Sequence, residues 1–301
     1  MFELKNEKIA IPVVLFAGLI WSFGPLVVRY MQEPHLFSWQ YIFARGLTIF
    51  IVLNLYLFFE EGSSFYKNYF KIGISGLIGG CGLGVAMVTF IYSITNTSAA
   101  VTLLCLAAMP FFTALLGFLF LKEKISLNVW IAIFIATIGI IIIAFGNTEK
   151  NSLIGFIFGL TSSVGFSVFS VSLRWRKETP KFTTVALAGL FCVTISTIFI
   201  LINELSFFSS SYNGSMFSLH GTLVCIGLIL YSIGSKAIPA AELTLLSLTE
   251  VIGGIFWVWL PLFGINEIPT TNTIIGGFFL SISIIYYSLT IKTNRRFIAL
   301  N

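Results

Sequence analysis

The feature that most constrains this chain is a series of apolar stretches, each about as long as a membrane is thick. A helix needs about 20 apolar residues to cross the hydrocarbon core. The stretches run over Ile9–Met31, Phe37–Phe59, Phe70–Ile94, Ala99–Leu121, Leu127–Phe145, Leu153–Leu173, Phe182–Ile202, Phe217–Ser235, Ala240–Phe263 and Ile274–Ile291. Only 10% of the residues are charged, against about 25% in soluble domains, which leaves very little room for the alternative of a soluble helical core. We predict an all-α integral membrane protein with ten transmembrane helices.

The positions of the lysines and arginines predict how these helices are oriented. If the N-terminus lies in the cytoplasm, 14 of the 17 cations fall on the cytoplasmic side. They are Lys5, Lys8, Lys67, Lys71, Lys122, Lys124, Arg174, Arg176, Lys177, Lys181, Lys236, Lys292, Arg295 and Arg296. Only Arg29 and Lys150 fall outside, and Arg45 lies within a span. Cytoplasmic loops carry an excess of Lys and Arg. We therefore expect a multi-pass protein of the plasma (inner) membrane with both termini in the cytoplasm.

The two halves of the sequence match each other when one is shifted by 141 positions. Polar and small residues carry the match: Ser22 and Gly24 fall on Ser163 and Gly165. Allowing three extra residues, Glu123 falls on Glu267. Each half holds five predicted spans, and because five is odd, the second copy must insert upside down. The sequence thus predicts two inverted five-helix repeats, residues 1–149 and 150–301, an arrangement that recurs in secondary transporters.

Two segments in equivalent positions of the halves resemble a known family. The stretches "TSAAVTLLCLAAMPFFTALLGFLFLKEKIS" (Thr97–Ser126) and "IPAAELTLLSLTEVIGGIFWVWLPLFGINEIP" (Ile238–Pro269) are similar to helices four and nine of EamA-type transporters, of the drug/metabolite transporter superfamily. The resemblance implies ten helices, transport of small metabolites, and a central cavity lined mainly by helices one, three, four, six, eight and nine. One departure is Val251, where the family often has a proline, so a weaker bend is expected in helix nine.

Two charged residues fall at membrane depth. Arg45 lies about 12 Å into the second span and Glu250 about 15 Å into the ninth, at 1.5 Å per residue. A charge at the centre of a transmembrane helix costs roughly 2.5–3.5 kcal/mol on insertion scales, so such residues are rare. We interpret both as candidates for charge or coupling roles, with Glu250 as a partner for a substrate amine or as a proton site. The alternative is a structural glutamate, neutralised by Arg45 or by protonation.

Polar and aromatic residues spaced three or four apart form stripes on several predicted helices, and two tyrosines lie near helix ends. Residues three or four apart share one face of a helix. The candidate substrate-binding residues are Trp21, Ser22, Tyr92, Thr102, Met109, Ser163, Ser167, Tyr231, Ser247, Glu250 and Trp257. Two alternatives remain open: the hydroxyl residues serve helix packing, and the tyrosines belong to an interfacial aromatic belt. The six glycines of helix three are interpreted as packing positions, because no phosphate-loop sequence follows them.

These patterns favour a secondary transporter of small organic metabolites working by alternating access. Amino acids are the leading class, because the predicted stripes offer hydroxyls, aromatics and few fixed charges. Export is the favoured direction. An importer or exchanger of nucleotide-derived or vitamin-like metabolites is the alternative within transport. A receptor-like or structural membrane protein is the alternative outside transport.

The remaining expectations concern chemistry and partners. The sequence contains no HExxH, GxSxG or Walker motif, so we expect no enzyme activity and no cofactor. Neither the four cysteines nor the two histidines have the spacing of a metal site, so no metal is expected. The expected partners are a small-molecule substrate and the lipid bilayer, with proton coupling as a possibility. No nucleic acid is expected, because the cations follow the membrane sidedness. The sequence leaves the oligomeric state open.

Overall fold

The computed structural model is built from helices throughout the part of the chain that it describes, residues 6–122, 127–146, 150–176, 178–235, 237–238 and 240–299. The first half holds α1 (Glu7–Trp21), α2 (Gly24–Tyr30), α3 (Ser38–Glu61), α4 (Lys67–Phe70), α5 (Gly73–Asn96), α6 (Ala99–Leu106), α7 (Met109–Leu121) and α8 (Leu127–Gly146). The second holds α9 (Lys150–Trp175), α10 (Lys181–Ile202), α11 (Ser211–Gly234), α12 (Ala240–Leu246), α13 (Thr249–Trp259) and α14 (Thr271–Ala299). Short 3-10 turns, Gly62–Ser64 and Pro261–Phe263, follow α3 and α13. Glu123 and the cations Lys5, Lys124, Lys177 and Lys236 lie outside the described residues.

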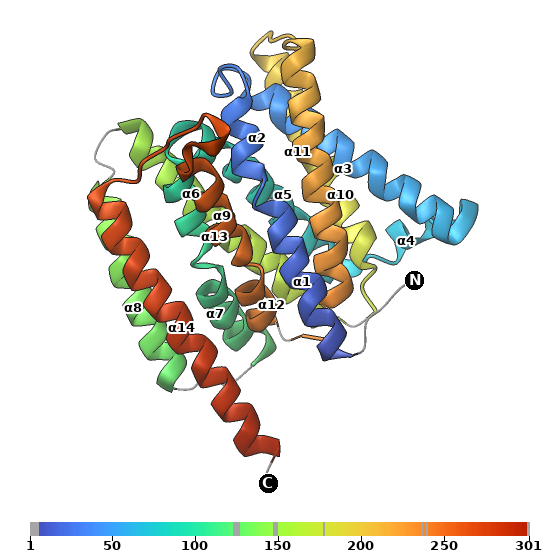
Figure 1. Cartoon of the computed structure of the whole chain (residues 1–301). Coiled ribbons are helices and arrows are strands. Elements are labelled where there is room, and N and C mark those ends of the chain that lie inside the picture. Colours follow the sequence, from blue (N-terminus) through green and yellow to red (C-terminus); the bar gives the residue numbers. More distant parts are fainter. Residues whose placement is uncertain are drawn as a thin grey trace.

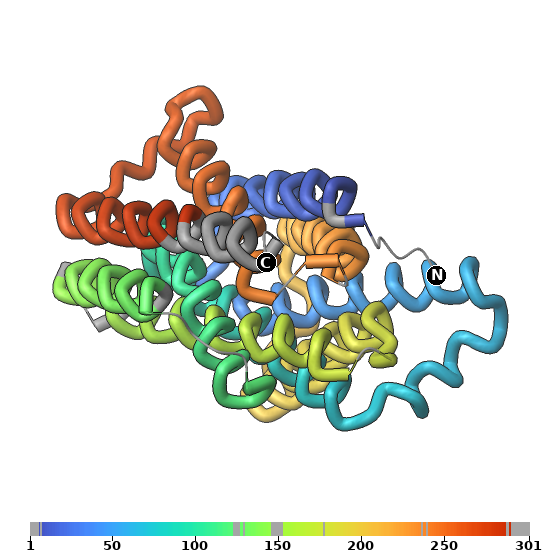
Figure 2. Tube along the Cα trace, turned by 90° about the horizontal axis from the view of Figure 1, so that it is seen from below, coloured from blue at the N-terminus to red at the C-terminus, as the bar shows by residue number. Residues whose placement is uncertain are grey.

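Eight helical segments within the described ranges are long and apolar enough to cross a membrane, counting helices on either side of a short interruption as one. They correspond to predicted spans one to four and six to nine. The predicted fifth and tenth spans contain shorter apolar stretches, Trp130–Phe145 and Thr271–Tyr286. Their helices, α8 and α14, pack against each other at one end of the molecule (Figure 2). An all-helical, multi-pass membrane architecture is therefore confirmed, while the count of ten spans stays a prediction.

The eighth span begins earlier than the sequence analysis placed it, at Ser211 rather than Phe217. Ser210 is the N-cap of α11, and its side chain accepts a hydrogen bond from the backbone N–H of Asn213 at 3.1 Å. A serine at this position satisfies one of the unpaired donors at a helix start. The polar stretch after Ser210 therefore forms the first turns of α11, although its hydropathy is that of a loop.

Three spans are interrupted near their middle (Figure 1). The first breaks between α1 and α2 and the fourth between α6 and α7, with Pro25 and Pro110 in the first turn of the helix that follows. Proline lacks a backbone N–H and is accommodated best at the start of a helix. The ninth breaks between α12 and α13 without a proline, so Val251 does not preserve a continuous helix. There the hydroxyl of Ser247 donates to the carbonyl of Thr244 at 2.8 Å, a contact that often bends helices.

The same contacts between helices are found when each helix is replaced by its equivalent in the other half. The pair α5–α9 has its counterpart in α11–α1, and α5–α10 in α11–α3. The pairs α3–α10 and α8–α14 each join equivalent helices of the two halves. The first residues of α6 and α12, Ala99 and Ala240, are 141 positions apart, as in the sequence match. One difference has a direct cause: α9 is continuous where α1 and α2 are not, because Phe166 occupies the position equivalent to Pro25.

The glycines of α5 let this helix pack closely against α9. A Cβ added to Gly82 would lie 3.0 Å from the carbonyl oxygen of Gly165 on α9, and one added to Gly165 would lie 2.6 Å from the carbonyl oxygen of Gly82. Distances this short leave no room for a side chain, so the two backbones approach each other as small residues allow in membranes. The interpretation of the glycine-rich helix as a packing surface is therefore confirmed at this contact.

Candidate functional site

A small cavity of about 60 Å³ lies among the helices of both halves. Its walls come from α1, α3, α5, α6, α7, α9, α11 and α13. Several wall residues form pairs related by the 141-residue shift. These pairs are Trp21 with Ser162, Leu83 with Val224, Met87 with Leu228, and Met109 with Glu250. The cavity therefore lies where equivalent faces of the two halves meet.

Arg45 and Glu250 both line this cavity. Arg45 comes from the first half of α3, and Glu250 lies in the first turn of α13, just after the interruption of that span. An acidic side chain is favourable at a helix N-terminus, because the backbone N–H groups there point toward it. Among the described residues, no ion pair joins Glu250 to Arg45. The guanidinium of Arg45 and the carboxyl group of Glu250 thus face one cavity without direct contact between them.

The guanidinium of Arg45 is buried and incompletely satisfied. The residue is 5% exposed, and its Nε and Nη1 atoms have no hydrogen-bond partner within the described chain. The guanidinium carbon lies 5.4 Å from the centre of the Phe90 ring, which supplies a cation–π contact. A buried donor without an acceptor is costly. Arg45 therefore has the binding capacity to accept an anionic group in the cavity.

His220 is a wall residue that the sequence analysis did not select. The eighth span was predicted to begin at Phe217, which put His220 near a helix end; this is wrong, because α11 begins at Ser211 and extends well past His220. Its Nδ1 atom is hydrogen-bonded to the hydroxyl of Tyr41, and both side chains are buried. This bond joins α3 to α11 beside Arg45. A histidine inside a membrane span could have indicated this residue, but the predicted start of the span at Phe217 put it near a helix end.

The serines of the sixth span contact backbone carbonyls of the interrupted fourth span. Ser163 donates to the carbonyl of Cys105 at 2.5 Å, and Ser167 donates to the carbonyl of Met109 at 3.1 Å. The carbonyl of Cys105 also accepts the backbone N–H of Ala108 at 3.1 Å, and Met109 begins α7, so the serines add second hydrogen bonds to these carbonyls and link α9 to both sides of the interruption. These serines lie outside the cavity wall. Of the two readings that the sequence left open, this geometry favours packing.

The other predicted hydroxyl residues also have partners within the protein. Thr102 is hydrogen-bonded to Ser93 at 2.8 Å. Ser22 donates to the carbonyl of Leu19 at 2.6 Å and accepts from the indole N–H of Trp257 at 3.0 Å. With Ser247, which donates to Thr244, they lie outside the cavity wall, as does Trp257. The bond of Thr102 thus joins α6 to α5, and the bond of Trp257 to Ser22 joins α13 to the interruption between α1 and α2.

Aromatic side chains support one wall of the cavity. The ring of Tyr231 lies 5.7 Å from Trp21 and 5.2 Å from Phe166, which both line the cavity, and its hydroxyl is hydrogen-bonded to Ser170 at 2.7 Å. Tyr231 therefore lies behind the wall. Tyr92 belongs to a separate group, with Trp39 at 5.2 Å and Phe158 at 5.4 Å. Of the predicted substrate-binding residues, the structure brings Trp21, Met109 and Glu250 to the cavity.

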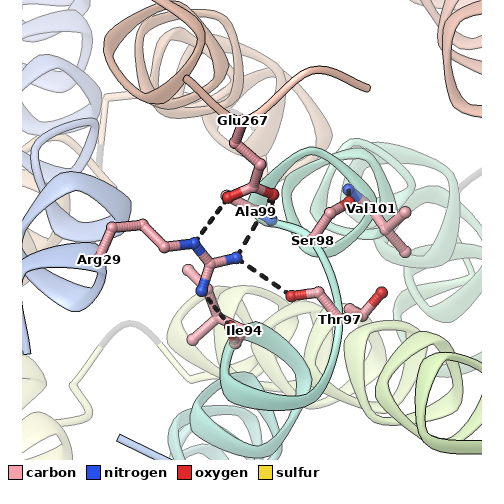
Figure 3. A network of polar contacts seen from close by, with 7 residues as sticks. All are labelled: Arg29, Ile94, Thr97, Ser98, Ala99, Val101 and Glu267. Atoms are coloured by element: carbon pink, nitrogen blue, oxygen red, sulfur yellow. Dashed lines mark hydrogen bonds and ion pairs between the residues drawn. The ribbon is translucent and has the colours of Figure 1, made fainter. Parts of the chain in front are cut away.

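A second polar network ties together the helix ends on the face that the cation pattern assigns to the outside (Figure 3). Arg29, in the last turn of α2, donates from Nε to Glu267 at 2.6 Å. Its Nη1 donates to the carbonyl of Ile94 at 2.8 Å and its Nη2 to that of Thr97 at 3.1 Å. Glu267, on the segment between α13 and α14, also accepts the backbone N–H of Ala99 at 2.6 Å. One ion pair thus links α2, the α5–α6 connection and the segment before α14.

Three comparisons relate the chain to known proteins. Residues 8–145 match the model of the EamA-like transporter family. An uncharacterized transporter of Helicobacter pylori strain J99 is 26% identical over 188 residues, which span 62% of this chain and 61% of that protein. A second, from strain ATCC 700392 / 26695, is 22% identical over 259 residues, 82% of this chain and 84% of that protein.

A comparison of folds covers nearly the whole chain. A protein of known crystal structure aligns with 95% of this chain and 99% of its own, with a TM-score of 0.64 and 16% sequence identity. At this identity the likeness concerns the fold alone. The resemblance to EamA-type proteins is confirmed by the family match over residues 8–145, which includes the first of the two stretches, Thr97–Ser126.

Proposed function

We propose that this chain, whose residues 8–145 match the model of the EamA-like transporter family, is a secondary transporter that moves small organic metabolites across the plasma membrane by alternating access. Amino acids are the leading substrate class, and export is the favoured direction. The observation that carries the proposal is the central cavity, which Arg45 and Glu250 both line without an ion pair between them among the described residues. Charges are kept at membrane depth where they serve a substrate or ion pathway.

The proposed mechanism rests on two inverted repeats, residues 1–149 and 150–301. It is supported by the helix pairs that recur when the halves are exchanged and by equivalent breaks in the fourth and ninth spans. Inverted halves can rock about a shared site, exposing it to one side and then the other. Interrupted helices at the site are expected in such carriers. Both termini then lie in the cytoplasm, in agreement with the cation distribution.

The network of Arg29 and Glu267 is the proposed closure on the outer side. It joins segments of both halves at one end of the molecule, so the halves cannot separate there while it is intact. Neither group has to leave water completely, because both side chains are 20% exposed.

The cavity dimensions favour small substrates. Its volume of about 60 Å³ is well below the roughly 300–1,000 Å³ of pockets for drug-sized ligands. One cation and one anion suit a compound with a carboxylate or an ammonium group. They suit a polyphosphate poorly, because each phosphate needs several donors or cations. A proton taken up by Glu250 would neutralise its carboxylate in the absence of a substrate amine. We therefore include coupling of transport to protons in the proposal, and exchange of one substrate for another is the alternative mechanism.

The test is transport by the purified protein in proteoliposomes, scanning amino acids against nucleotide sugars, with and without an imposed pH gradient. Protein-free liposomes and Glu250→Gln protein serve as controls. We expect saturable amino-acid flux that the glutamate variant loses. Exchange of nucleotide sugars without amino-acid flux would overturn the substrate class. Failure to move any member of the panel, with folded protein correctly reconstituted, would overturn transport itself.

A further inference from the structure

Two groups of the cavity wall that can carry a full charge, Arg45 and Glu250, remain available to a ligand. Ser162 donates to the carbonyl of Ala86 at 2.9 Å, and the Nδ1 atom of His220 is engaged by Tyr41. In contrast, Arg45 has two buried N–H positions without a partner, and no hydrogen bond reaches the carboxylate of Glu250 from the described residues. The other wall positions are apolar. A complementary ligand therefore presents an anionic group, a cationic group and an apolar part.

From this geometry we infer that the cavity binds a free amino acid with an apolar side chain, its carboxylate at Arg45 and its ammonium at Glu250. The inference rests on the proposed function and adds to it the orientation of the substrate and the character of its side chain.

The assignment of each end follows from the donors and acceptors. A guanidinium has five N–H donors and no acceptor, so Arg45 can bind a carboxylate but repels an ammonium. An ionised carboxylate only accepts, so Glu250 takes the ammonium. Charge-assisted bonds of this kind are the strong ones, and they gain strength away from water. A zwitterion satisfies both side chains at once, whereas a simple amine or acid leaves one of them unpaired in the cavity.

The apolar wall defines the third part of the ligand. Leu83, Met87 and Phe90 come from α5, Val224 and Leu228 from α11, and Met109 from α7. A polar side chain placed against them would lose its hydrogen bonds to water and gain none, which costs free energy. The two methionines can adjust to apolar groups of different shape. We therefore expect leucine or a similar residue to bind better than serine or glutamate.

The first measurement needs no variant. Uptake of labelled L-leucine into proteoliposomes is competed by unlabelled L-leucine, by isopentylamine, which lacks the carboxylate, and by 4-methylpentanoate, which lacks the amine. An unpaired hydrogen bond to a charged group costs about 1.5–3 kcal/mol. Each analogue should therefore compete about 10-fold to 100-fold more weakly than leucine. L-serine and L-glutamate should compete more weakly than leucine as well.

The second measurement assigns the two ends. Binding of the same three compounds is followed by the shift in thermal midpoint of the purified protein. With Arg45→Met, 4-methylpentanoate should lose its stabilising effect while isopentylamine keeps its own. With Glu250→Gln, isopentylamine should lose its stabilising effect while 4-methylpentanoate keeps its own. Lys181→Met is the matched control: it removes another buried cation, bonded to Ser235 and absent from the cavity wall, and should keep the wild-type preferences.

The outcomes separate this inference from the proposed function. If isopentylamine or 4-methylpentanoate competes as strongly as leucine in the wild type, one charge has no role in binding, and the inference is wrong while transport stands. The same holds if the variants weaken both analogues equally. If polar amino acids compete best, the apolar wall does not face the side chain. If no metabolite is transported and none shifts the thermal midpoint, the proposed function itself fails. The competition experiment remains decisive even if Arg45→Met does not fold.

Discussion

The contact between Arg29 and Glu267 makes the most specific prediction, because its loss should open one side of the protein. Replacing Glu267 with alanine removes the ion pair at 2.6 Å and the acceptor of the Ala99 N–H at 2.6 Å. Arg29 keeps its bonds to the carbonyls of Ile94 and Thr97, so it is not left without partners. We expect the closed state to lose stability relative to the open state.

The magnitude follows from the geometry. Hydrogen bonds to charged groups contribute about 1.5–3 kcal/mol each when buried, and exposed ion pairs contribute less than about 1 kcal/mol. Both side chains are 20% exposed, so we place the total loss for Glu267→Ala at about 1.5–3 kcal/mol. Each 1.4 kcal/mol corresponds to a factor of ten. The population open to the outside should rise about 10-fold to 100-fold. Glu267→Gln keeps one acceptor oxygen and should give a smaller rise.

The assay is thiol labelling from outside the cell. Met87, on the cavity wall, is replaced by cysteine after the native cysteines have been removed, and a membrane-impermeant maleimide is added to intact cells. If opening and closing are faster than labelling, the labelling rate is proportional to the open population. Glu33→Gln is the control: it removes an acid on the segment after α2 without altering the network.

Two results would refute this reasoning. An unchanged labelling rate in Glu267→Ala, together with a lower thermal midpoint, would mean that the network only stabilises the fold. Faster labelling from the cytoplasmic side would mean that the predicted orientation of the network is inverted.

Three further predictions concern orientation, helix packing and coupling. Topology reporters fused at Lys150 and Arg296 should read opposite sides of the membrane, with the reporter at Arg296 in the cytoplasm; the same side for both would contradict the ten-span arrangement. The double change Ser163→Ala and Ser167→Ala should lower stability by about 1–2 kcal/mol, since hydrogen bonds between membrane helices average about 0.6 kcal/mol and reach about 1.7. Thermal unfolding measures this loss, and unchanged stability would show that the carbonyls of α6–α7 do not need these hydroxyls. If Glu250 carries a proton, a pH gradient should stimulate transport by the wild type and not by Glu250→Gln; equal wild-type rates with and without the gradient would remove the proton from the mechanism.

The sequence alone determined the class of the protein and its series of helices. Ten apolar stretches in a chain with few charges leave helices as the available structure, because backbone groups in lipid must be satisfied within the segment. Eight of these stretches meet the criteria for a span, and the family resemblance rests on stretches legible in the sequence. The main error in a helix boundary, at the start of α11, arose because polar residues form the first turns of that helix. Hydropathy reports contact with lipid and does not report helix capping.

The candidate site could be predicted only in part. Arg45 and Glu250 were identified because a charge within an apolar stretch stands out whatever its neighbours are. The hydroxyl residues were ambiguous, because their spacing shows which face of a helix they share and does not show what that face contacts. The same pattern fits a cavity wall and a helix contact, and the distances from Ser163 to Cys105 and from Ser167 to Met109 distinguish the two.

Only the tertiary structure decided which distant residues meet. Arg29 and Glu267 are separated by most of the chain, and His220 joins Tyr41 from another span. Such contacts depend on how helices cross and how closely their backbones approach, as Gly82 and Gly165 do. These distances arise from packing between segments, which local hydropathy does not encode. The periodicity of a helix determines which residues share a face, whereas the packing of the whole bundle determines which other helix that face contacts.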